Sequence, residues 1–100
     1  MEYIVNRVSE EALLEQLIEE CGELVQASAK RLRIIRGENP TPITLDDNIK
    51  NMVEELADVS LCARAAISKL NIRARVLIKQ DEKLDRWHNR INEAEEEKRN

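Results

Sequence analysis

Two groups of acidic residues interrupt apolar stretches of the chain, and they are the side chains best suited to chemistry. The groups are Glu19-Glu20-Cys21-Gly22-Glu23 and Glu54-Glu55-Leu56-Ala57-Asp58. In a helix, residues three apart share a face, so Glu20 would project with Glu23. The same spacing would place Glu55 beside Asp58. Carboxylates gathered near an apolar core repel one another and lose hydration, and a hard cation such as Mg²⁺, which prefers oxygen ligands, would offset both costs.

A solvated surface is the simpler explanation for any single pair, because Glu forms helices well and is common on exposed faces. Two features indicate that these acids are not simply a solvated surface. Gly22 lies within the strongest helical pattern of the chain, where glycine costs ~1 kcal/mol relative to alanine, so we expect another helix or a ligand to approach closely there. The second group also repeats the spacing of the first, and antiparallel helices would bring the four carboxylates together.

The first long helix is predicted to begin after Ser9, a good N-cap that is followed by Glu10 and Glu11, and to stop at Gly37. Before it, residues 3–5 are expected to form a short turn that packs on a neighbouring element. The apolar stripe predicted to face the core of this helix consists of Leu14, Leu17, Ile18, Cys21, Leu24, Val25, Ser28, Leu32 and Ile35.

Two prolines place a loop at residues 38–42, after which Thr44 or Asp46 can cap a second helix that runs to about Leu70. Its predicted buried stripe consists of Ile49, Met52, Val53, Leu56, Ser60, Ala63 and Ile67. A weak break at Asn71 leads into a third helix. A coiled-coil-like seam is predicted there from the seven-residue repeat of Leu70, Leu77, Leu84 and Ile91, with Trp87 between the last two.

The composition favours an all-α fold in one domain that spans residues 1–100. The chain has 100 residues, of which 36% are charged, and it has only two glycines, two prolines and two aromatic residues. We expect an antiparallel helical bundle whose core is completed by homo-oligomerisation, as a homodimer or homotetramer, with the third long helix packing across the subunit interface. Residues 93–100 are nearly all charged and are expected to fray.

Charge and cysteine usage exclude several classes of protein. The formal net charge of −4 argues against a nucleic-acid partner. The sequence lacks a run of ~18 apolar residues, so no membrane-spanning helix is expected. Cys21 and Cys62 are too few for a disulfide scaffold or a zinc site, and a reduced, cytoplasmic protein is the simpler prediction.

The two acidic stretches resemble the MazG-like all-alpha nucleoside triphosphate pyrophosphohydrolases, a superfamily that includes dimeric dUTPases and phosphoribosyl-ATP pyrophosphohydrolase. The resemblance covers roughly residues 10–91 and is specific in LIEECGELVQASAK (17–30) and MVEELADVSLC (52–62). Besides the acids, the matching positions are Gly22, Leu24, Ala27, Lys30, Leu56 and Ala57. The spacer of thirty-one residues between Glu23 and Glu55 is longer than in compact members. This departure bears on substrate contacts made by the loop and not on the metal site.

The resemblance implies hydrolysis of a nucleoside triphosphate between its alpha and beta phosphates, giving the monophosphate and pyrophosphate in nucleotide-pool house-cleaning. It assigns the Mg²⁺ ligands, with Mn²⁺ as a substitute, to Glu20, Glu23, Glu55 and Asp58. Glu19 and Glu20 would be the catalytic acids, with Glu19 orienting water or sharing a second metal. Cationic side chains that would neutralise the triphosphate are Lys30, Lys83 and Arg86.

Two alternatives stay open at the level of the sequence. The chain could be a non-catalytic helical oligomerisation module whose acidic faces bind no metal. It could also keep the fold and act on dUTP or phosphoribosyl-ATP, because the acids address only the phosphates and the metal and leave the base unspecified.

Overall fold

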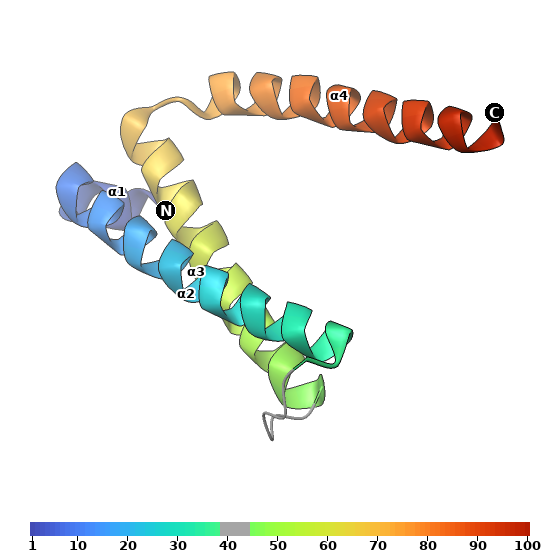
Figure 1. Cartoon of the computed structure of the whole chain (residues 1–100). Helices are drawn as coiled ribbons and strands as arrows, with labels where there is room; N and C mark the ends of the chain where they lie inside the picture. The colour runs from blue at the N-terminus through green and yellow to red at the C-terminus, as the bar shows by residue number, and fades with distance from the viewer. Residues whose placement is uncertain (39–44) are drawn as a thin grey trace. The chain divides into compact units, whose positions relative to one another are not determined.

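The structure, a computed structural model, describes residues 1–38 and 45–100, and its regular elements in those ranges are all helices (Figure 1). They are α1 (Glu2–Arg7), α2 (Glu10–Arg36), α3 (Leu45–Leu70) and α4 (Arg73–Arg99). These helices form two compact units, Met1–Leu70 and Asn71–Asn100. The all-α prediction is therefore confirmed, with one short helix added to the three long ones. Within the described ranges, none of the helices has the length and apolar character needed to cross a bilayer.

The two ends of α2 are fixed by the residues that the sequence indicated. At the start, the Ser9 hydroxyl accepts a hydrogen bond from the backbone N–H of Ala12 at 3.1 Å, which satisfies one of the free donors of the first turn. At the end, Gly37 adopts the left-handed conformation with φ 65°. Its backbone N–H donates to the carbonyl of Ile34 at 3.2 Å. Glycine takes this conformation without the steric strain that a Cβ would add.

The break between α3 and α4 falls at Asn71, as predicted. Asn71 has a positive φ of 55°, a conformation that asparagine tolerates better than most residues. Leu70 therefore ends α3, and the predicted seven-residue seam is wrong in including it with Leu77 and the later residues of α4. Of the two predicted caps, Thr44 lies outside the described residues, and Asp46 lies in the first turn of α3.

The charged end of α4 corrects a second prediction. We expected residues 93–100 to fray, and the structure keeps α4 helical as far as Arg99. The segment contains no glycine or proline, and its Glu, Ala, Lys and Arg residues are strong helix formers. Local propensity is sufficient to continue the helix there without burial, since every residue from 77 to 100 is exposed.

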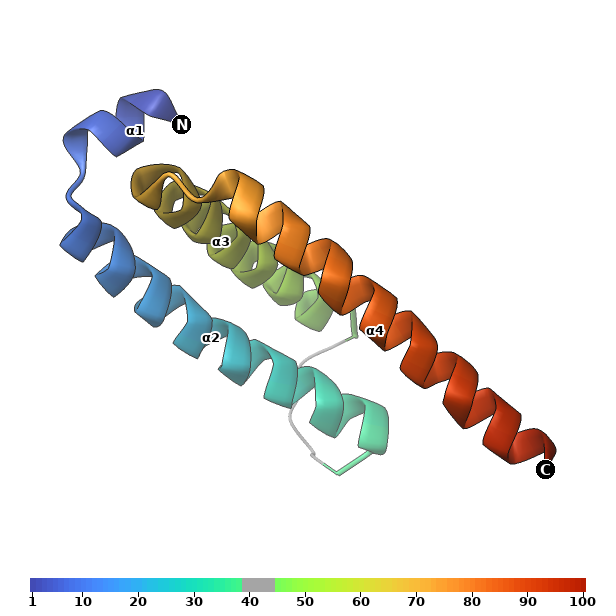
Figure 2. The same ribbon diagram turned by 90° about the horizontal axis from the view of Figure 1, so that it is seen from above.

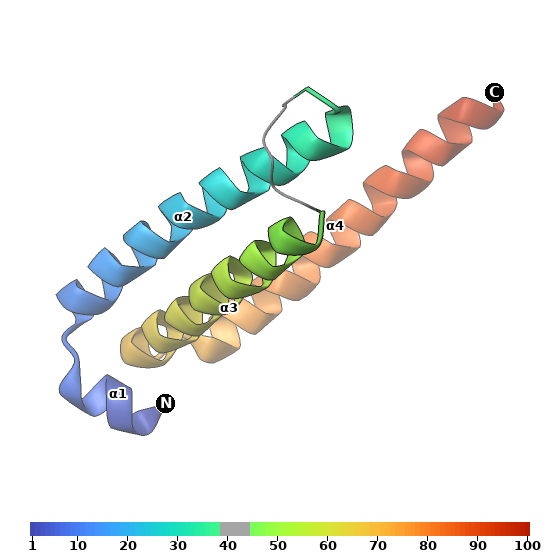
Figure 3. The same cartoon turned by 90° about the horizontal axis from the view of Figure 1, so that it is seen from below.

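α2 and α3 lie side by side as an antiparallel pair (Figures 2 and 3). Glu20 interacts with Asp58, and Glu23 with Glu55. Later positions on α2 thus meet earlier positions on α3, as antiparallel packing requires. Among the described residues, the buried hydrophobic core consists of Leu13 and three small residues, Ala27, Ala65 and Ala66. Small residues allow the two backbones to approach closely, and the predicted antiparallel pairing is confirmed.

The first residues form a helix rather than the predicted turn. α1 packs against α3, where the Lys69 ammonium donates a hydrogen bond to the carbonyl of Val5 at 2.7 Å. The guanidinium of Arg7 also stacks on the ring of Tyr3, 3.6 Å from its centroid. The neighbour that this segment packs on is therefore the C-terminal end of α3.

The buried residues of α2 each precede a residue of the predicted buried stripe by one position. Leu13, Glu20 and Ala27 are buried and Leu17 and Leu24 are half-buried. The remaining predicted core residues are instead exposed, and they form what we call the outer stripe: Leu14, Ile18, Cys21, Val25, Ser28, Leu32 and Ile35. α2 carries two adjacent apolar faces, and helical spacing alone does not show which of them meets α3.

α3 shows the same division between two faces. Of its predicted core, Met52, Ala63 and Ile67 are half-buried. The other members of that stripe are exposed: Ile49, Val53, Leu56 and Ser60. Gly22 also differs from expectation, because a Cβ added there would meet no atom within 4 Å. Among the described residues, nothing approaches this glycine closely.

Candidate metal centre between the two long helices

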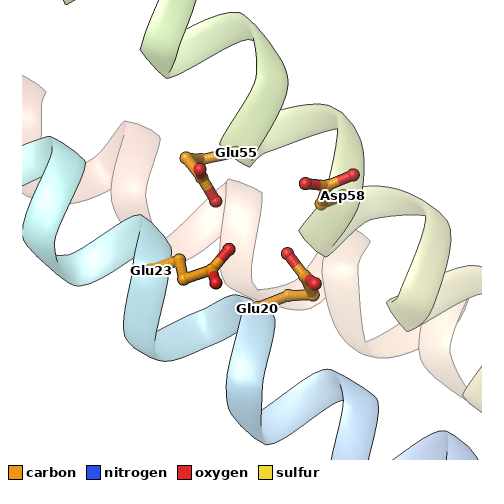
Figure 4. A group of neighbouring side chains, drawn as sticks. All are labelled: Glu20, Glu23, Glu55 and Asp58. Atoms are coloured by element: carbon orange, nitrogen blue, oxygen red, sulfur yellow. The ribbon is translucent and has the colours of Figure 1, made fainter.

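Four carboxylates from α2 and α3 converge in the middle of the helix pair. Glu20, Glu23, Glu55 and Asp58 each offer one oxygen, and these four oxygens all lie within 4.8 Å of one another. Figure 4 shows the side chains pointing toward one another, two from each helix. The spacing of three residues on each helix puts its two acids on one face, and the antiparallel packing turns both faces inward.

Two oxygens of this cluster have no hydrogen-bond partner although they are buried. They are Oε2 of Glu20 and Oε2 of Glu55, and neither contacts a donor among the described residues. Glu20 as a whole is only 9% exposed. A buried polar atom without a partner destabilises the fold, the more so when it carries charge. A bound cation would satisfy both atoms, and an all-carboxylate donor set suits a hard divalent ion.

The protonation equilibria of the cluster show the same electrostatic strain. The pKa of Glu23 is raised first by the charge of Glu55 and then by burial. The pKa of Glu20 is raised first by burial and further by the charges of Glu23 and Asp58, against the opposing effect of its hydrogen bond from Gln16. Negative charge is therefore unfavourable at this site until something neutralises it.

The other predicted site residues lie outside the four. Glu19 is exposed, and its charge makes only a minor contribution to the raised pKa of Glu23. Lys30 is half-buried on α2, beyond Glu23 in the direction of Gly37. Lys83 and Arg86 are exposed on α4, in the other compact unit. Their contacts with a substrate stay predictions.

Two further residues lie near the carboxylates, and one of them, Gln16, was not singled out from the sequence. Gln16 donates a hydrogen bond from its amide nitrogen to Oε1 of Glu20 at 2.8 Å. Its position four residues before Glu20 is a spacing that could have revealed it. The half-buried Cys62 lies four residues after Asp58, and burial, followed by the charges of Glu20 and Asp58, raises its thiol pKa.

An antiparallel helix pair with a carboxylate cage between its members defines the class as an all-α protein with a candidate site for a hard metal ion. The chain matches the MazG nucleotide pyrophosphohydrolase domain over residues 8–90, and it belongs to this family, as the resemblance predicted. The match takes in α2, α3 and most of α4. No significant match is found among curated proteins or among solved structures.

The raised pKa values predict how stability depends on pH when no divalent cation is present. In the folded chain the pKa values of Glu20 and Glu23 are raised above their ordinary value of 4.5. Between the ordinary and the raised values, the folded chain therefore binds more protons than the unfolded chain. Stability should then fall as the pH rises from the ordinary value through the raised values. Thermal melting followed by circular dichroism should show this fall to be smaller in Glu23→Gln than in the unmodified chain.

Glu54→Gln is the matched control, because Glu54 is exposed on α3 and stands outside the cluster. It should keep the pH dependence of the unmodified chain. Equal slopes for Glu23→Gln and Glu54→Gln would show that repulsion within the cluster does not limit stability.

Proposed function

We propose that this protein is an Mg²⁺-dependent nucleoside triphosphate pyrophosphohydrolase that cleaves (d)NTPs to (d)NMPs and pyrophosphate, with Mn²⁺ as a possible substitute. The observation that carries the proposal is the convergence of four carboxylates with two buried, unpartnered oxygens. Membership of the MazG nucleotide pyrophosphohydrolase family supports the reaction class. House-cleaning of the nucleotide pool is the role we assign to it.

The acidic residues would have two different roles in phosphoryl transfer, metal binding and orientation of the attacking water. Glu20, Glu23, Glu55 and Asp58 would hold the ion, which when bound neutralises phosphate oxygens and activates water. We assign the orientation of the attacking water to Glu20 and to Glu19, its neighbour on α2. No nucleophilic side chain is needed for this chemistry.

Cationic residues complete the proposed substrate site. The triphosphate carries more negative charge than one divalent ion neutralises, so further positive groups must contact it. We assign this role to Lys30 on α2 and to Lys83 and Arg86 on α4. The family match runs through both compact units, which supports a single functional domain over residues 1–100.

Loss of one cage carboxylate should abolish turnover without unfolding the helices. Glu23→Ala or Asp58→Ala is expected to lower kcat/KM by about 100-fold or more, the scale on which single preorganised electrostatic groups act. The measurement is pyrophosphate release from a panel of canonical and modified nucleotides, dUTP and phosphoribosyl-ATP included. Circular dichroism should report unchanged helical content.

Glu54→Gln again serves as the control and should keep full activity, since Glu54 is exposed outside the cage. The panel also separates the substrates that the carboxylates cannot distinguish. Absence of pyrophosphate release from every nucleotide, with Mg²⁺ present, would rule out the proposed reaction.

A metal titration separates the enzyme from the alternative of a non-catalytic oligomerisation module. If Mg²⁺ binds the folded chain alone, it must stabilise the fold, by about 2.7 kcal/mol at a concentration one hundred times Kd. We therefore expect the melting temperature to rise with Mg²⁺ and to return on chelation. A module without a metal site predicts no shift, and it would gain stability when the acids are removed.

We also propose that the core is completed by self-association through the outer stripe of α2. Successive residues of this stripe are spaced alternately by four and three positions, which is the repeat of a coiled-coil seam. Ile18 and Val25 are 73% and 69% exposed in the single chain. The exposed apolar residues of α3 offer a second surface for the same purpose. A homodimer or homotetramer would cover both.

A charge placed in the outer stripe should dissociate the assembly. Val25→Glu would bury an unpaired carboxylate in an apolar interface, so we expect light scattering after size exclusion to show a lower mass than for the unmodified protein. Gln26→Glu adds the same charge to an exposed residue outside the stripe and should keep the assembly. An unmodified protein that is monomeric at the concentrations of the assay would contradict self-association.

A further inference from the structure

The Glu20 carboxylate is held in an asymmetric way. Its Oε1 accepts a hydrogen bond from the Gln16 amide at 2.8 Å, while its Oε2 is buried with no partner. Both residues lie on α2, one helical turn apart. Helical side chains lean toward the N-terminus of their helix, so Glu20 leans toward Gln16. One oxygen is thus anchored to its own helix and the other remains for the cluster.

This anchor opposes the electrostatic force on Glu20. Repulsion from Glu23 and Asp58 would favour rotation of the carboxylate away from the cluster, toward solvent. The hydrogen bond from Gln16 holds it in place, and bonds to charged groups are worth more than bonds between neutral ones. The carboxylate therefore stays in the cage before any ion arrives.

The amide is also the right kind of donor for this purpose. A lysine or arginine at the same position would form an ion pair with Glu20 and neutralise the charge that a cation needs. An amide donates a hydrogen bond and carries no net charge, so the carboxylate keeps its full attraction for a metal ion. Gln16 itself is exposed, and its contribution to the core is small.

We propose that Gln16 is a positioning residue that preorganises Glu20 for a divalent cation, with Oε1 held by the amide and Oε2 left for the metal. The inference rests on the proposed metal centre and adds a residue outside the four carboxylates. Residues that orient metal ligands in this way typically change metal affinity by about 10–100-fold when they are lost.

The test measures Mn²⁺ binding to the full chain from the electron paramagnetic resonance signal of the free ion. Gln16→Leu removes the amide and keeps a side chain of similar bulk, and we expect Mn²⁺ affinity to fall by about 10–100-fold. Gln26→Leu is the matched control, an exposed glutamine on the same helix outside the cage, and should bind Mn²⁺ normally.

Gln16→Lys distinguishes positioning from a structural role. It keeps a donor and adds a charge, so the metal-free melting temperature should be maintained or raised while Mn²⁺ affinity falls. A purely structural role predicts that affinity follows stability. Normal Mn²⁺ affinity in Gln16→Leu would overturn the proposal.

Experiments on the unmodified protein distinguish failure of the proposed reaction from failure of the proposed role of Gln16. If it binds no Mn²⁺, the metal centre fails and the role of Gln16 fails with it. If it binds Mn²⁺ with the expected dependence on Gln16 but releases no pyrophosphate, the proposed reaction fails and the positioning role stands.

Discussion

Mutual repulsion among four carboxylates is the constraint around which the helix pair is built. Glu20, Glu23, Glu55 and Asp58 bring their oxygens within 4.8 Å of one another, and nothing among the described residues neutralises them. The raised pKa values of Glu20 and Glu23 record the resulting cost. Such an arrangement lowers the stability of the empty fold, and it becomes favourable when a cation supplies the missing positive charge. The fold is thus less stable without a cation, but the four carboxylates of the candidate site are already in place.

The packing on either side of the cage makes this arrangement possible. Small residues allow α2 and α3 to run close together, with Ala27 beyond the cage on one side and Ala65 and Ala66 beyond it on the other. The close approach carries the carboxylates of one helix into reach of those of the other. Farther along, the Arg31 guanidinium donates to the Asn48 side-chain oxygen at 3.5 Å, so polar contacts continue along the seam. The seam between the helices is therefore shaped by the acids as much as by apolar burial.

The acids occupy part of the inner face of each helix, and many of the larger apolar side chains lie on the exposed outer faces. Ile18, Val25 and Ile35 on α2 are more than half exposed, as is Val53 on α3. A single chain with so small a buried core would be weakly stable. Self-association would bury these outer faces and supply the stability that the charged inner face cannot. As proposed, self-association and metal binding would each offset a cost of placing acids on the inner faces of the two helices.

The sequence by itself determined the all-α fold, the ends of α2 at Ser9 and Gly37, and the four carboxylates as a group. Each depends on local rules: caps, a glycine in the left-handed conformation, and a period that puts residues three apart on one face. Only the tertiary structure decided which apolar face of α2 is buried. The two candidate faces differ by a single residue, and the choice depends on how α3 packs. The partner of Gln16 and the unpaired oxygen of Glu20 were likewise settled by three-dimensional contacts, since spacing shows which residues share a face but not which atoms meet there.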